Sequence, residues 1–376
     1  MNSDALSAYW KAQLEERAAD GLLRTPEPPG TGLVDFASND YLGLVYQGGL
    51  RRLYHQALSE PDLPLGATGS RLLTGQTPQL AQTEALLAET HQAEAALVFS
   101  STYQANLAFF SALLPRTGTY IYDELSHASI RDGLRLSPAR AYKFPHLDWG
   151  ALAQRLTQTS SPKVVVTESV FSMDGDSPDL EALAQLCIEH QAWLVVDEAH
   201  ALGVAGPAGL GLAQALAERP ELNLVRVLGF GKAFALGGGA ILGSALLKTW
   251  LVNTARPLIY TTAANPLLLR VLELLYRDSQ AWAGQRQELL RLTTLYDEQM
   301  GVSQSDLPLQ GAIRTWSVPG NREVMQAEAQ LKAQGLDVRG IRSPTVAAGT
   351  ERLRIVLHAH NTPEQVRTLT SLLKKL

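Results

Sequence analysis

Between about residues 70 and 250, short apolar and β-branched runs alternate with stretches in which apolar residues recur at helical spacing. The short runs predict strands at AALVFS (95–100), TYIYD (119–123), RAYKF (140–144), KVVVTES (163–169), WLVVDEA (193–199) and LVRVLG (224–229). Stretches such as QLAQTEALLAETHQ and PDLEALAQLCIEHQ predict helices between them. This alternation is typical of a mainly parallel sheet with helices on both faces.

Helix starts and the chain's first segment extend this pattern. Thr77-Pro78, Ser177-Pro178 and Thr362-Pro363 each place a possible capping hydroxyl before a proline at the first helical position. Gln365 follows Thr362 by three residues, which predicts a capping box. Residues 1–24 predict an amphipathic helix, and its apolar side consists of Leu6, Tyr9, Trp10 and Leu14.

The pattern changes at two places, which predict the domain boundaries. RTPEPPGTG (24–32) is rich in proline and glycine and predicts a linker. Beyond about residue 258, long helices are followed by short strands and a final helix, as in a small α+β domain. We therefore expect an N-terminal helix and linker at 1–44, a large α/β domain at 45–257 and a small domain at 258–376.

Composition narrows the protein class. The 376 residues are 45% hydrophobic and 18% charged, with a formal net charge of -5, so no general attraction to nucleic acid is expected. The one cysteine, Cys187, lies at helical spacing and predicts a packed thiol in a reducing compartment. No signal-peptide pattern and no run of roughly 18 apolar residues is present. We expect a soluble cytoplasmic protein.

The stretch WLVVDEAHALG (193–203) admits two interpretations. Asp197-Glu198-Ala199-His200 could be the acidic box of a helicase, or a strand end that delivers a carboxylate and an imidazole to an active site. A helicase also needs the phosphate loop G-x-x-x-x-G-K-[ST] on an earlier strand. The only Gly-Lys pair, Gly231-Lys232, lacks that pattern and follows the box, so the helicase interpretation fails.

Lys232 lies in a glycine-rich turn, GFGKAFALGGG, after a predicted buried strand. Desolvation favours the neutral amine, which can form a Schiff base with an aldehyde. Asp197, at the end of the preceding strand, could keep the ring nitrogen of pyridoxal 5'-phosphate protonated. The alternatives are an exposed loop lysine and a capping or satisfied buried aspartate.

Several ordered blocks carry a family resemblance. They are FASNDYLGL, GATGSRLLTG, YDELSHASIRDG, TESVFSMDGDSPDL, VVDEAHALGVAG, GFGKAF, IYTT and RLRIVLHAH, and they run from about residue 30 to the C-terminus. The chain resembles the α-oxoamine synthases of the fold-type I pyridoxal-phosphate enzymes. The resemblance implies the transferase fold of that group, with a mainly parallel central sheet and a smaller C-terminal α+β domain.

The same resemblance implies four catalytic residues. Lys232 would form the Schiff base with the cofactor and later move the Cα proton. Asp197 would pair with the pyridine nitrogen, and His200 would hydrogen-bond the 3'-oxygen. His127 would stack on the ring face, with an ordinary capping histidine as the alternative. No metal is expected.

Further residues match positions that line the cofactor pocket or bind the substrate. Glu168 and Ser172 match positions that line the cofactor pocket. Asn39 and Arg354 match the groups that hold the substrate carboxylate, for which the paired donors of arginine are suited. Arg24 could meet the distal carboxylate of a dicarboxylic acyl chain, or could be an exposed surface arginine.

The cofactor phosphate is expected at the helix start in SSTYQAN, where backbone amides and the helix dipole favour an anion. Thr102, Tyr103 and Asn106 belong to that segment. In the family, a threonine of IYTT reaches the phosphate from the neighbouring subunit. Thr262 is the matching residue, which implies a homodimer with shared active sites.

The chain departs from the family at two positions around the phosphate. The family usually has glycine where Thr102 stands, and a phosphate-binding threonine where Gly229 stands. One hydrogen bond to a charged group, worth about 1.5–3 kcal/mol, is therefore expected to be missing unless Thr102 supplies it. LHAHN also departs from the usual block, which leaves the roles of His358 and His360 open.

Family members condense a small amino acid with an acyl thioester and release CO2. YDELSHASIRDGLRLS and AYKFPHLDW most resemble the branch that joins L-alanine to a pimeloyl thioester in biotin synthesis. Glycine with a short acyl-CoA, or serine with a long one, is the alternative, because fold and cofactor do not choose among them. The carrier could be coenzyme A or acyl-carrier protein. A catalytically inactive partner subunit is the non-enzymatic alternative, and Gly229 is the feature in its favour.

Overall fold

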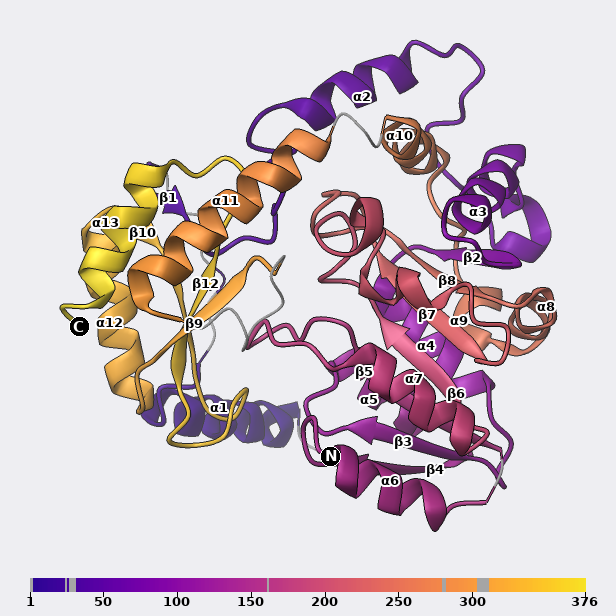
Figure 1. Cartoon of the computed structure of the whole chain (residues 1–376), viewed down its shortest axis with the longest axis horizontal. Coiled ribbons are helices and arrows are strands. Elements are labelled where there is room, and N and C mark those ends of the chain that lie inside the picture. The colour runs from indigo at the N-terminus through magenta and orange to yellow at the C-terminus, as the bar shows by residue number, and fades with distance from the viewer. Residues whose placement is uncertain (1–2, 24–25, 27–31, 161, 279–281, 303–310) are drawn as a thin grey trace.

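The computed structural model describes residues 3–23, 26, 32–160, 162–278, 282–302 and 311–376. A seven-stranded sheet in the order β2-β8-β7-β6-β5-β3-β4 forms its centre (Figure 1). Neighbouring strands are parallel except at β8, which is antiparallel to both β2 and β7. The strands are Ala95–Phe99 (β2), Thr119–Asp123 (β3), Arg140–Phe144 (β4), Lys163–Glu168 (β5), Trp193–Asp197 (β6), Leu224–Gly229 (β7) and Gly239–Gly243 (β8).

All six strands predicted from the sequence are present, and the mainly parallel sheet is confirmed. The prediction missed β8. Its three apolar residues lie between Gly239 and Gly243 and run almost directly into the apolar helix α8 (Ala245–Thr254). The strand pattern is therefore too short to separate from the helix that follows.

Helices cover both faces of the sheet, and alternate residues of β5 show this. Val164 and Val166 belong to the apolar cluster under one group of helices, while Val165 belongs to the cluster under the other group. The first group is α4 (Thr102–Ala112), α5 (Ala128–Leu136), α8 and α9 (Arg256–Ile259), and the second is α6 (Trp149–Thr157) and α7 (Leu180–Glu189). Burial on both faces explains why the central strands are almost entirely apolar.

The C-terminal part contains a three-stranded antiparallel sheet in the order β11-β12-β9, packed with three helices (Figure 1). These elements are β9 (Ile313–Ser317), β11 (Arg339–Ile341), β12 (Arg352–Val356), α11 (Ala283–Met300), α12 (Asn321–Ala333) and α13 (Pro363–Leu373). α10 (Pro266–Arg277) packs instead on α2 (Gly49–Leu58) and α3 (Pro78–Thr90). Shorter helical turns span Arg71–Gly75, Pro207–Gly209 and Leu212–Leu216.

The segment before α2 is attached to the C-terminal part. β1 (Val34–Asp35) pairs with β10 (Leu336–Asp337), the Val356 amide donates to the Phe36 carbonyl, and the Ala359 amide donates to the Tyr41 carbonyl. Residues 34–41 therefore lie beside the end of β12. The boundaries at residues 45 and 258 stay a prediction.

Two of the three predicted helix starts are confirmed. Thr77 caps α3, and Thr362 forms a capping box with Gln365 at α13. The prediction at Ser177 is wrong. Asp179 caps α7 through the Ala182 amide, and the Ser177 hydroxyl donates to the Ser169 carbonyl.

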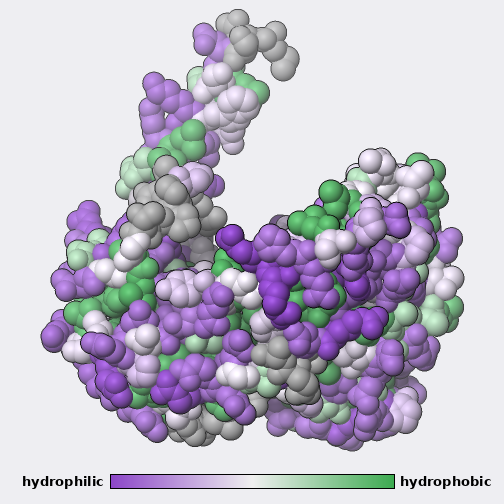
Figure 2. All heavy atoms as spheres, turned by 90° about the horizontal axis from the view of Figure 1, so that it is seen from above, coloured by the Kyte–Doolittle hydropathy of each residue, from purple (hydrophilic) through white to green (hydrophobic). Residues whose placement is uncertain are grey.

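The first helix, α1 (Ser3–Ala19), is present as predicted and projects from the body of the protein (Figure 2). Its apolar side chains remain exposed, with Trp10 at 55%. None of the helices in the described part of the chain combines the length and the apolar character that crossing a membrane requires.

Candidate active site

The carboxyl ends of β5, β6 and β7 bring three predicted site residues together. Glu168 ends β5, Asp197 ends β6, and Lys232 follows β7. Both carboxylates act on the lysine amine, because they raise its pKa while burial, the larger effect, lowers it. The net lowering of the Lys232 pKa favours the neutral amine, as predicted.

The Asp197 carboxylate is held in a fixed orientation. One oxygen accepts a hydrogen bond from the Asn106 amide at 2.8 Å, and the other accepts from the Ala199 backbone amide at 2.9 Å. Asn106 lies in the second turn of α4 and also donates to the Ser129 hydroxyl at 2.9 Å. In this structure Asn106 therefore orients the Asp197 carboxylate.

His127 caps α5 and faces the same centre. Its Nδ1 lies 2.8 Å from the Ser129 hydroxyl, and its backbone amide donates to Glu168 at 2.6 Å. Burial lowers the pKa of His127. Burial also raises the pKa of Glu168 to about 8, and the charge of Asp197 adds to that rise. Sequence reasoning missed Ser129, whose only signal was its place in the block LSHAS.

A second group of residues surrounds Arg354 on β12. The Arg354 Nε donates to the Ser172 carbonyl at 2.7 Å, and one terminal nitrogen donates to the Asn39 side-chain oxygen at 3.1 Å. The Tyr41 hydroxyl lies 3.1 Å from that same oxygen and 2.7 Å from Nδ1 of His200. The structure thus brings Asn39 and Arg354 together, as predicted, and links them to His200 through a residue that the sequence reasoning missed.

Thr102 opens α4, where the first backbone amides of a helix have no acceptor within it. Its side chain fills the space beside Gly229, since a Cβ at that glycine would lie 2.9 Å from Thr102 Oγ1. A Cβ at Gly239 would lie 2.9 Å from the backbone of Thr102. Thr102 is therefore packed between two glycines, and its hydroxyl lies close to where the family's threonine side chain would begin.

The remaining predicted residues have different surroundings. Tyr103 is 41% exposed, donates a hydrogen bond to Asp132, and meets the His127 ring edge-on with the centroids 6.3 Å apart. Thr262 pairs with Ser70 in an isolated bridge and lines a small cavity at the start of α4. Arg24 lies outside the described residues.

These residues fit pyridoxal 5'-phosphate. The buried Asn106 side-chain oxygen has no hydrogen-bond partner among the described residues, while its amide orients Asp197. A lysine with a lowered pKa, an oriented carboxylate and the N-terminal end of α4 match the cofactor's aldehyde, ring nitrogen and phosphate respectively.

His358 and His360, whose roles were open, contact the segment before α2. The His358 ring nitrogens are 3.1 Å from the Asp35 carbonyl and 3.0 Å from the Ser38 carbonyl, so the ring fastens the strand end to residues 35–38. The His360 ring stacks on Tyr46 and on His358. Asp35, His358 and His360 could come within reach of one ion, but the two rings are nearly parallel, at 23°, and their in-plane lone pairs do not converge.

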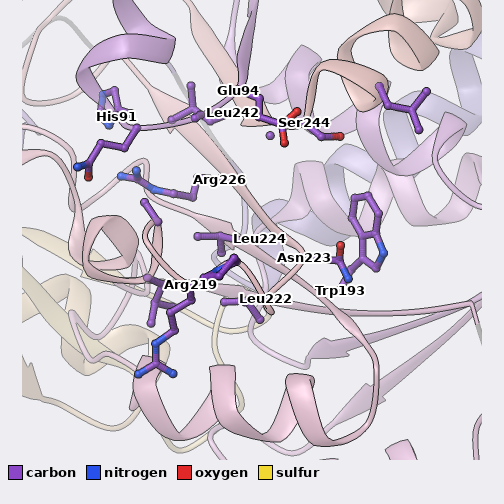
Figure 3. Close-up of a pocket in the computed structure, with 17 residues that line it drawn as sticks. His91, Glu94, Trp193, Arg219, Leu222, Asn223, Leu224, Arg226, Leu242 and Ser244 are labelled. Atoms are coloured by element: carbon purple, nitrogen blue, oxygen red, sulfur yellow. The ribbon is translucent and has the colours of Figure 1, made fainter.

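A cavity of about 550 Å³ lies at the other end of the parallel strands, beside the first residues of β6 and β7 (Figure 3). Several of its polar side chains already have partners. His91 contacts Gln214 and Tyr276, and Arg226 donates to Glu198 and Gln214. This cavity is therefore distinct from the candidate site.

Comparison with known proteins agrees with a site for pyridoxal 5'-phosphate. A model of the aminotransferase class I and II family matches residues 31–373. The 8-amino-7-oxononanoate synthase of Vibrio cholerae is 36% identical over 364 residues, which cover 97% of this chain and 92% of that protein. The synthase of the same name from Alkalilimnicola ehrlichii is 36% identical, with 99% and 98% covered.

Two solved structures share the fold over most of their length. The 8-amino-7-oxononanoate synthase of Francisella tularensis has a TM-score of 0.77 at 27% identity, covering 92% of this chain and 98% of that one. The serine palmitoyltransferase of Sphingomonas wittichii has a TM-score of 0.84 at 27% identity, covering 99% and 96%.

Proposed function

Since the chain belongs to the aminotransferase class I and II family, we propose that it is a pyridoxal 5'-phosphate-dependent acyltransferase of the 8-amino-7-oxononanoate synthase type. Its reaction joins L-alanine to a pimeloyl thioester and yields 8-amino-7-oxononanoate, CO2 and the free thiol. The observation that carries the proposal is the convergence of Lys232, Asp197 and the Asn39–Arg354 pair at one site, in a chain 36% identical to such synthases over nearly its whole length.

Lys232, Asp197 and His200 would hold the reacting end of the cofactor. When bound, pyridoxal 5'-phosphate supplies a conjugated ring that accepts the electron pair left at the amino acid's Cα. Asp197, oriented by two hydrogen bonds, would keep a proton on the ring nitrogen. The Lys232 amine, with its lowered pKa, can attach to the aldehyde and then carry the Cα proton on Nζ.

Arg354 and Asn39 would bind the amino acid's carboxylate. Arg354 is 7% exposed and is held by Ser172 and Asn39, so its guanidinium has a fixed direction. Such a donor fork orients a carboxylate bidentately. Fixing the carboxylate also fixes which bond to Cα is aligned for cleavage, so the binding energy is used to orient the substrate.

A different amino acid is the second candidate for the substrate. The similarity to a serine palmitoyltransferase, with a higher TM-score than the solved synthase at equal identity, favours it. The identity to curated synthases over nearly the whole chain favours L-alanine. Pimeloyl-CoA and pimeloyl acyl-carrier protein are both possible donors.

We further propose a cytoplasmic homodimer. The exposed apolar side of α1 and the exposed Tyr260, close to Thr262, are surfaces that a second copy would cover. In that dimer, Thr262 of one subunit would reach the cofactor phosphate of its partner. Sedimentation of the purified protein tests this part of the proposal.

The proposed function is tested by the visible absorption of the protein loaded with cofactor. We expect a band that disappears in Lys232→Ala and changes on addition of L-alanine more than of glycine or L-serine. Adding pimeloyl-CoA should then release free thiol and CO2. A response to serine alone would assign the palmitoyltransferase type. A protein that takes up no cofactor would favour the inactive-subunit alternative.

A further inference from the structure

Tyr41 joins two groups of site residues that come from different parts of the fold. It is fully buried, and its hydroxyl lies 2.7 Å from His200 Nδ1 and 3.1 Å from the Asn39 side-chain oxygen. His200 follows β6 in the large sheet, whereas residues 34–41 are attached to the C-terminal part. The hydroxyl therefore bridges the two parts at the candidate site.

The bridge continues to the arginine of the carboxylate site. The Asn39 oxygen that faces Tyr41 also accepts a hydrogen bond from Arg354 at 3.1 Å. Both ends of the Asn39–Tyr41 link therefore lead to groups with a proposed ligand, the cofactor at His200 and the amino acid at Arg354.

The protonation states of the bridge are defined by burial. Burial raises the pKa of Tyr41 to about 12, and it lowers the pKa of His200 well below its ordinary value. A neutral phenol thus meets a neutral imidazole. The phenol has one proton, which it donates to the Asn39 oxygen, while the tautomer of His200 sets whether its Nδ1 donates to the hydroxyl or competes for that proton.

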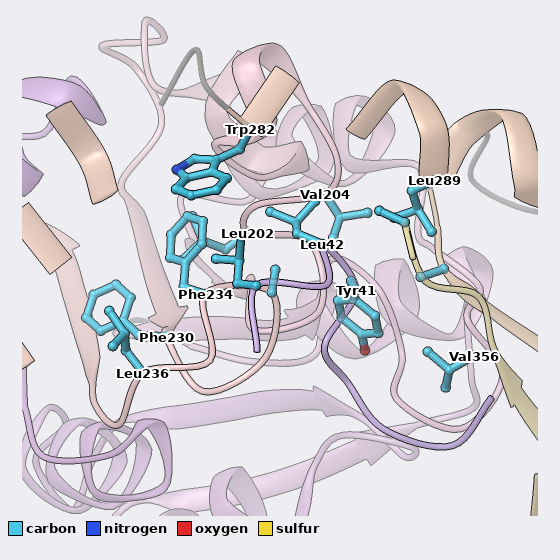
Figure 4. Close-up of a cluster of buried hydrophobic side chains, with 14 of the residues drawn as sticks. Tyr41, Leu42, Leu202, Val204, Phe230, Phe234, Leu236, Trp282, Leu289 and Val356 are labelled. Carbon is cyan, nitrogen blue, oxygen red and sulfur yellow. The ribbon is translucent and has the colours of Figure 1, made fainter. Parts of the chain in front are cut away.

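The Tyr41 ring itself has little freedom to move. It belongs to the apolar cluster that also contains Leu42, Val204 and Val356, and its oxygen points away from Leu42 and Val204 (Figure 4). The hydroxyl is consequently positioned by packing and not by its hydrogen bonds alone. Replacing Tyr41 by phenylalanine would keep this packing and remove only the bridge.

We propose that Tyr41 is a positioning residue that couples His200 to the Asn39–Arg354 carboxylate site. This inference rests on the proposed function, because it assigns the amino acid to Arg354 and the cofactor to His200. In Tyr41→Phe, Asn39 loses one of the two neighbours that fix its side-chain oxygen, and Arg354 holds the carboxylate less well. The binding of amines without a carboxylate should be unchanged in Tyr41→Phe.

The experiment compares Tyr41→Phe with Tyr296→Phe in the cofactor-loaded protein. Tyr296 is a matched control, because it is 1% exposed and its hydroxyl has no hydrogen-bond partner among the described residues. Each variant is titrated with L-alanine and with ethylamine, which is L-alanine without its carboxylate, and the visible absorption is followed. We expect Tyr41→Phe to bind L-alanine about 2- to 13-fold more weakly, the range for one neutral hydrogen bond, with unchanged ethylamine binding.

Thermal unfolding of both variants establishes that they are folded, and Asn39→Ala provides a second variant that removes the other end of the link. A double variant Tyr41→Phe/Asn39→Ala should weaken L-alanine binding less than the two single effects combined. Equal losses for L-alanine and ethylamine, or no loss for either, would overturn the coupling. A wild-type protein that responds to no amino acid would overturn the proposed function, and this inference with it.

Discussion

The hydroxyl of Thr102 is predicted to replace the phosphate ligand that Gly229 lacks. Thr102 is the first residue of α4, and its Oγ1 lies 2.9 Å from the place of a Cβ on Gly229. Thr102→Val keeps the volume and removes the hydroxyl. Because a hydrogen bond to a charged group contributes about 1.5–3 kcal/mol, cofactor binding should weaken by about 10- to 150-fold.

The complementary variant, Gly229→Thr, is predicted not to tighten cofactor binding. Its Cβ would stand 2.8 Å from the Ala199 Cβ and 2.9 Å from Thr102 Oγ1, both closer than side-chain carbons and their neighbours normally come. Overpacking of this kind costs about 1–3 kcal/mol. Ala199 lies between Asp197 and His200, so the displacement would also disturb the site.

Equilibrium titration of the cofactor-free protein with pyridoxal 5'-phosphate measures both effects. Thr249→Val is the matched control, because Thr249 is exposed on α8 and its hydroxyl donates only within that helix, to the Ala245 carbonyl. Wild-type affinity in Thr102→Val would refute the assignment of its hydroxyl. Tighter binding in Gly229→Thr would refute the packing argument.

Three further predictions concern stability. Burial lowers the pKa of His146, but two carboxylates 2.9 and 2.7 Å from its ring nitrogens outweigh burial and raise the pKa to about 10. The contribution of His146 to the stability of the folded state should be complete below pH 6.5 and lost as pH rises through about 10, which urea unfolding of wild type and His146→Gln would measure. Glu168 has its pKa raised to about 8, so the folded state loses stability between pH 4.5 and 8; Glu168→Gln should remove that loss in the same assay, and an unchanged slope would contradict it. Arg314 donates to both oxygens of Asp297 at 2.6 Å inside the C-terminal part, and Arg314→Met, which leaves the buried carboxylate unpaired, should lower the free energy of chemical unfolding by about 3–5 kcal/mol.

Local patterns predicted most of the large sheet because each central strand is buried on both faces. KVVVTES and WLVVDEA are apolar at nearly every position, and the structure places strands there. β8 escaped prediction because its glycines and its short length hide the pattern. The Ser177 cap was wrong because a hydroxyl can bond to any nearby carbonyl, and Ser169 supplied one.

The sequence by itself predicted most of the elements, the family resemblance and the candidate residues of the reacting centre, because strand periodicity and motif blocks are local properties of the chain. The tertiary structure alone decided which distant residues meet. Thr102 faces Gly229, and Tyr41 connects His200 to Asn39, through contacts made only when separate elements pack together. Such contacts depend on packing between elements, which no local pattern records.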